Sequence, residues 1–150
     1  MNTLERWSAE GKVQLDRTFR LRMETAKYVP ARAKMERMNV VAEPAVADVS
    51  FYDTDEIFYA DVPGPQFDEL SSVLFPGVAP RDVALDPNRA NDVMHLVAHA
   101  SGGGAIFVTQ DEKDFIKGSR REQLREAFGI VVMTPEEAVA HLADEHGWRK

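Results

Sequence analysis

The sequence predicts an α/β fold of three layers, α/β/α, with a mostly parallel central sheet. In its second half, helical patterns over residues 89–101 and 119–128 alternate with apolar runs at residues 105–108 and 130–133. Short strands that alternate with helices favour right-handed crossovers and parallel pairing. Because the apolar runs show no alternation with polar residues, they are typical of strands covered on both faces.

The N-terminal part gives weaker signals. Residues 3–9 predict a helix, because Leu4 and Trp7 share one face and Gly11 is suited to end it. Residues 13–15 alternate apolar and polar and predict a short strand, with Thr18 as the cap of a following helix.

The middle of the chain is punctuated by proline. The helix after Thr18 carries Glu24, and Pro30 interrupts it before helical spacing resumes over residues 31–38. Residues 39–65 predict strand and loop. Residues 67–75 have helical spacing that Pro76 and Gly77 end.

The C-terminal elements have clear boundaries. Three glycines at 102–104 end the helix over residues 89–101, and Gly129 ends the helix over residues 119–128. Thr134, Pro135 and Glu137 are a cap, a first-turn proline and the acid of a capping box, so they predict the start of the last helix.

Composition limits the class of protein. With 150 residues the chain is predicted to be a single domain, residues 1–150. The absence of cysteine excludes disulfides and thiolate metal sites and favours a cytoplasmic protein. No stretch approaches the roughly 20 apolar residues of a membrane span, and the N-terminus lacks the apolar segment of a secretory signal. The net charge of −7 argues against a general nucleic-acid-coating protein, but not against an enzyme that meets phosphates through a metal ion.

Three acidic residues are candidates for a site. Asp111 and Asp114 follow the apolar run at residues 105–108, at the end of a strand where such sheets place their functional crevice. Asp92 is expected in the first turn of the helix that leads back to that strand. Two charges about 4 Å apart repel by roughly 4 kcal/mol at an effective dielectric near 20, so converging carboxylates favour a bound cation such as Mg²⁺. A structural explanation is also open, in which Asp92 is a helix-start residue and Asp111 and Asp114 are turn or cap residues.

Three segments resemble the second half of a PIN domain: NDVMHL at 91–96, AIFVTQDEKDF at 105–115 and FGIVVMTPEEA at 128–138. The resemblance covers roughly residues 13–142. It implies a ribonuclease that depends on Mg²⁺ or Mn²⁺ and cleaves single-stranded RNA, often as a toxin held by an antitoxin protein, and it implies a homodimer. By position it makes Asp92, Asp111 and Asp114 the metal-binding acids, Thr109 the supporting hydroxyl, and Glu24 the earlier catalytic acid.

The chain departs from the family at its N-terminus. PIN domains begin with a strand that ends in a ligand Asp, whereas this sequence begins in the helix that would follow it, so that strand is missing. Two explanations remain open: a sequence that starts downstream of the strand, or a degenerate member that binds metal weakly. Asp53 or Asp55 are possible substitutes for the missing ligand.

Two further groups have a functional and a structural explanation. A basic stretch lies beside the acids in the sequence and comprises Lys113, Lys117, Arg120, Arg121 and Arg125. It is suited to bind the RNA backbone, or else it is the solvated face of a helix. His95 and His99 lie four residues apart, which permits zinc binding, but no third ligand is evident and a polar helix flank is the simpler explanation.

These patterns support two hypotheses of different class. The first is a PIN-like ribonuclease that uses Asp92, Asp111, Asp114 and Glu24. The second is a catalytically inactive PIN-fold module that binds RNA or a protein partner.

Overall fold

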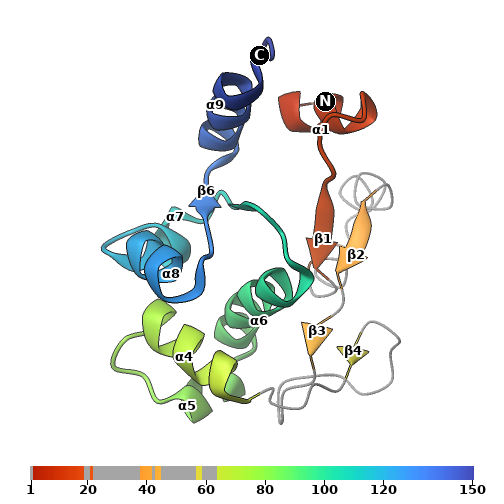
Figure 1. The fold of residues 1–150 in the computed structure, drawn as a ribbon. Helices are drawn as coiled ribbons and strands as arrows, with labels where there is room; N and C mark the ends of the chain where they lie inside the picture. Colours follow the sequence, from red (N-terminus) through yellow and green to blue (C-terminus); the bar gives the residue numbers. More distant parts are fainter. Residues whose placement is uncertain (1, 19–20, 22–37, 42, 45–56, 59–63) are drawn as a thin grey trace. The chain divides into compact units, whose positions relative to one another are not determined.

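The computed structural model describes residues 2–18, 21, 38–41, 43–44, 57–58 and 64–150 (Figure 1). The chain is a mixed α/β protein in which helices predominate and the strands are short and parallel. It divides into two compact units. Unit 1 consists of Met1–Leu15 and Ala105–Lys150, so it joins the two ends of the sequence, and unit 2 is Asp16–Gly104.

Unit 1 contains one pair of strands and four helices among its described residues. They are α1 (Thr3–Ala9), β5 (Phe107–Val108), α7 (Glu112–Phe115), α8 (Arg120–Phe128), β6 (Val132–Met133) and α9 (Pro135–His146). The strands β5 and β6 are parallel, with Phe107 opposite Val132 and Val108 opposite Met133. Parallel strands both deliver their carboxyl ends to the same edge, which places the start of α9 and the residues after β5 close together.

The core of unit 1 lies between α1 and α9. Leu4, Trp7, Ala138 and Ala143 form a buried cluster, and Trp7 is 0% exposed. Val13, Leu15, Met133, Val139, Leu142 and Trp148 pack against it. The predicted helix over residues 3–9 is confirmed, including the burial of Leu4 and Trp7 on one face.

The predicted capping box of the last helix is confirmed. The Thr134 hydroxyl accepts the Glu137 backbone N–H at 3.2 Å, and the Glu137 carboxylate accepts the Thr134 N–H at 2.9 Å. Arg121 on α8 also donates to Glu137, at 3.0 Å. The Thr134 N–H and, next, Arg121 hold the pKa of Glu137 below its usual value, because both stabilise the carboxylate. Gly129 ends α8 in the left-handed conformation, also as predicted.

Replacing Thr134 by alanine should destabilise unit 1 by about 1 kcal/mol, the usual cost of losing an N-terminal cap. The substitution removes the side-chain acceptor of the Glu137 N–H. Urea denaturation followed by circular dichroism measures the loss, and Thr134→Ser is the matched control because it keeps the hydroxyl. Equal midpoints for the two variants would show that the cap contributes nothing.

Unit 2 combines short strand pairs with three packed helices. Its described elements are β1 (Asp16–Thr18), β2 (Asn39–Val41), β3 (Glu43–Pro44), β4 (Ile57–Phe58), α4 (Gly64–Leu74), α5 (Pro80–Leu85) and α6 (Pro87–Gly102). The pairs β1–β2 and β3–β4 are parallel. The helices α4, α5 and α6 contact one another (Figure 1), and each carries buried apolar side chains. They include Phe67, Leu70, Leu74, Val83, Val93, Met94, Leu96 and Val97.

The structure corrects the predictions in the N-terminal part. The first strand is Asp16–Thr18 and not residues 13–15, and Thr18 is its last residue. Val13 and Leu15 instead pack their side chains against the core cluster of unit 1. The helix predicted to carry Glu24, and its continuation to residue 37, lie outside the described residues.

Two corrections bear on the site. The strand predicted over residues 105–108 is only Phe107–Val108, and Val108 is 39% exposed, so the expectation of coverage on both faces is wrong there. The helix α6 begins at Pro87, with the Asp86 carboxylate accepting the backbone N–H groups of Asn88 and Arg89. Asp92 therefore lies in the second turn and not in the first.

The described strands form three separate two-stranded pairs. In the part of the chain that the structure describes, no helix has both the length and the apolar character needed to cross a membrane.

Candidate active site at the carboxyl end of β5

Residues 109–114 form a compact turn, here called the Asp111 turn. The backbone N–H of Thr109 donates to the carbonyl of Met133 at 3.0 Å, so pairing with β6 continues one residue beyond β5. The Thr109 hydroxyl then accepts the Asp111 N–H at 3.0 Å, and the Asp111 carboxylate accepts the Asp114 N–H at 3.0 Å. Side chains thus satisfy the backbone groups that the end of the strand leaves unpaired.

The turn is anchored on both sides. Before it, β5 pairs with β6. After it, Phe115 is 3% exposed and its ring lies 5.2 Å from that of Phe107. Since the backbone at both ends is fixed by packing or by strand pairing, the Asp111 and Asp114 side chains leave from a defined position.

The structure brings together three of the predicted site residues: Thr109, Asp111 and Asp114, all in unit 1. Asp111 is exposed and Asp114 is half-buried. Asp92 is half-buried on α6 and belongs to unit 2. Glu24, Asp53 and Asp55 lie outside the described residues.

Asp111 caps α7, as the structural explanation of this residue predicted. The same explanation is wrong for Asp92, because α6 begins at Pro87 and Asp92 lies in its second turn. The Asp111 carboxylate can accept further contacts while it caps α7. An ionised carboxylate offers about four acceptor positions, and the Asp114 N–H occupies one of them.

The donors at the Asp111 turn are oxygens alone, the set that Mg²⁺ and Mn²⁺ prefer. Within either unit, counting only described residues, no group of three or more histidine and acidic side chains is close enough to hold a metal ion. Asp111 and Asp114 alone could supply only part of a coordination shell.

Two of the five cations in the predicted basic stretch are engaged in contacts within the protein. Arg120 donates to the Lys113 carbonyl, and Arg121 forms an ion pair with Glu137 at 3.0 Å. Lys113, Lys117 and Arg125 are exposed. These three are therefore better placed than Arg121 to meet a phosphate backbone beside the Asp111 turn.

His95 and His99 lie on α6 in unit 2, both half-buried. A Cβ atom added to Gly104 would lie only 2.7 Å from the His99 ring, so the ring packs closely against that glycine. Burial lowers the pKa of His99, which favours its neutral form. These contacts are what a polar helix flank requires.

Two features escaped the sequence prediction. The start of α6 at Pro87 was signalled by the Asp86–Pro87 pair, since proline favours the first helical position and aspartate the cap. Trp148 carried no sequence signal, because it follows the last helix and finds its partner Trp7 at the other end of the chain.

No protein-family model matches this chain, and neither a curated protein nor a solved structure is significantly similar to it.

Proposed function

We propose that this chain is a metal-dependent endoribonuclease of the PIN type that cleaves single-stranded RNA with Mg²⁺ or Mn²⁺. The proposal includes the three-layer α/β/α arrangement and Asp92, Asp111, Asp114 and Glu24 as the acidic site. It also includes the partners that the family resemblance implies, an antitoxin protein and a second copy of the chain in a homodimer.

The observation that carries the proposal is the geometry of the Asp111 turn. Two carboxylates, Asp111 and Asp114, follow the carboxyl end of a parallel strand, and the Asp111 carboxylate is held by a hydrogen bond from the Asp114 backbone N–H. The carboxyl ends of parallel strands are where α/β proteins place catalytic residues. Thr109 holds the backbone of Asp111 and can still donate its hydroxyl proton.

The chemistry follows from these groups. Asp111 and Asp114 would hold the metal ion. A bound divalent ion supplies an activated water and stabilises the leaving oxygen of a phosphodiester. Lys113, Lys117 and Arg125 would hold the RNA backbone next to the acids, since phosphate contacts supply most of the affinity for RNA.

A second candidate is an inactive PIN-fold module that binds RNA or a protein. The capping role of Asp111 favours it, because a residue retained for a turn needs no metal. The same exposed cations serve RNA binding in both candidates, so cleavage is what separates them.

The test is a cleavage assay on a labelled single-stranded RNA with added Mn²⁺ or Mg²⁺. Cleavage should stop when EDTA removes the metal and return when Mn²⁺ is added in excess. Full cleavage in EDTA would overturn the metal-dependent mechanism. Absence of cleavage together with retained RNA binding would favour the inactive module.

A further inference from the structure

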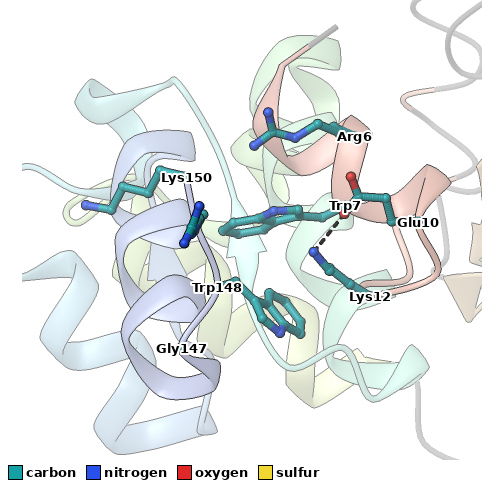
Figure 2. Close-up of a pocket in the computed structure, with 8 residues that line it drawn as sticks. Arg6, Trp7, Glu10, Lys12, Gly147, Trp148 and Lys150 are labelled. Carbon is teal, nitrogen blue, oxygen red and sulfur yellow. Dashed lines mark ion pairs between the residues drawn. The ribbon is translucent and has the colours of Figure 1, made fainter.

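A second feature of unit 1 lies away from the Asp111 turn. A pocket of about 410 Å³ opens between α1 and the segment 147–150 that follows α9. In Figure 2, side chains from α1 and from this segment gather around the Trp7 ring. The lining residues are Arg6, Trp7, Glu10, Lys12, Gly147, Trp148, Arg149 and Lys150.

The pocket is strongly basic in a chain whose net charge is −7. Four of its eight lining residues are cations and one, Glu10, is an acid. Lys12 forms an ion pair with Glu10 at 2.7 Å, and this contact holds the pKa of the Glu10 carboxyl below its usual value. Among the described residues no ion pair is formed by Arg6, Arg149 or Lys150, so the excess positive charge stays available.

The rings of Trp7 and Trp148 line the same pocket, and the His146 ring lies beside it. Trp148 is half-buried and meets Trp7 edge-on at 5.2 Å between ring centroids. The exposed His146 ring stacks on Trp148 at 4.5 Å, and the Lys12 ammonium lies 5.6 Å from the centre of the Trp148 ring. A stack of rings beside unneutralised cations is the combination that binds a base together with its phosphates.

We propose that this pocket binds single-stranded nucleic acid, with Arg149, Lys150 and Arg6 contacting phosphates and the ring stack of Trp148 and His146 contacting a base. Uncompensated cations alone would also suit an acidic peptide. The adjoining stack of rings favours a nucleic acid, because every base offers a face to stack on.

The position of the pocket agrees with an RNA strand that reaches the Asp111 turn. The turn lies at the N-terminal end of α9, where Thr109 pairs with Met133. The pocket lies past the C-terminal end of the same helix. The 12 residues of α9 span about 18 Å at 1.5 Å per residue. In this respect the inference rests on the proposed function and names a second contact for its substrate.

Tryptophan fluorescence is a direct probe, because the two tryptophans of the chain are Trp7 and Trp148 and both line the pocket. The experiment titrates the full chain in EDTA with a short oligouridylate, an oligoglutamate of equal length, and inorganic pyrophosphate. EDTA prevents metal-dependent cleavage, so binding is measured alone. The oligouridylate should change the fluorescence and bind more tightly than the other two ligands.

Substitution locates the site. Arg149→Ala and Lys150→Ala together should weaken oligouridylate binding roughly tenfold at low salt. They should also reduce the slope of log affinity against log salt by about 1.4, about 0.7 for each lost phosphate contact. Arg81→Ala is the control for loss of an exposed cation outside the pocket, because Arg81 lies in unit 2; it should change neither quantity.

Tighter binding of oligoglutamate would overturn the proposal in favour of an acidic protein partner. Equal binding of pyrophosphate would also overturn it, because the pocket would then bind anions without recognising a base. Unchanged affinity in the double variant would remove the pocket as the binding site. A chain that binds oligouridylate here but never cleaves RNA retains this inference and loses the nuclease proposal, so the two fail separately.

Discussion

Asparagine in place of Asp111 is expected to abolish RNA cleavage and leave the chain folded. Asparagine and aspartate cap helices about equally well, so the acceptor for the Asp114 N–H is kept. The negative charge is lost, and with it the anionic metal ligand that the proposed function requires. Changes in residues that merely orient metal ligands cost 10–100-fold, so loss of a ligand should reduce the cleavage rate by roughly 100-fold or more.

The substitutions Asp111→Ala and Asp111→Asn separate the capping role of the carboxylate from its proposed role as a metal ligand. Asp111→Ala removes charge and cap together, so it should also lower the free energy of unfolding by about 1 kcal/mol. Asp111→Asn should unfold at the same urea concentration as the unsubstituted chain. Asp144→Asn is the matched control, since Asp144 is an exposed acid of α9 in the same unit.

Cleavage rates compared at equal protein and Mn²⁺ concentrations give the result. Full activity in Asp111→Asn would mean that Asp111 serves only as a cap, and the acidic-site hypothesis would lose its strongest residue. Loss of activity in Asp144→Asn as well would show that the assay responds to net charge and not to the Asp111 turn.

Sequence reasoning succeeded where a feature depends on residues a few positions apart. The capping box of Thr134 and Glu137, the glycine that ends α8 and the apolar face of α1 are such features, because their hydrogen bonds and contacts close within one helical turn. The Asp111 turn is of the same kind, since Thr109, Asp111 and Asp114 bond to one another.

Prediction from the sequence was wrong where the residues that contact each other lie far apart in the chain. Val13 and Leu15 have the alternation of a strand, but they pack on a core whose other half comes from α9, and the strand begins at Asp16. The pairing of β1 with β2 joins residues more than 20 positions apart, which no local pattern specifies. For the site, the grouping of Asp111 with Asp114 is local, whereas Asp92 belongs to the other unit, so its membership of the site stays a prediction.

Removing the Trp7 side chain should cost unit 1 a large part of its stability. Trp7 is 0% exposed and packs with Leu4, Ala138 and Ala143. Replacing a buried tryptophan by alanine typically costs about 3–5 kcal/mol, a large part of the roughly 5–15 kcal/mol by which small proteins are stable. Helix α1 has 7 residues, and isolated helices of that length do not persist in water, so its formation depends on this packing.

Urea denaturation followed by far-ultraviolet circular dichroism measures the cost. Arg6→Ala is the control on the same helix, because Arg6 is exposed and surface substitutions usually stay within about 0.5 kcal/mol. Trp7→Phe should lie between the two, since it keeps a smaller ring in the cluster. A loss below about 1 kcal/mol for Trp7→Ala would mean that α1 contributes little to the core, and the pocket between α1 and the segment 147–150 would then lack a stable wall.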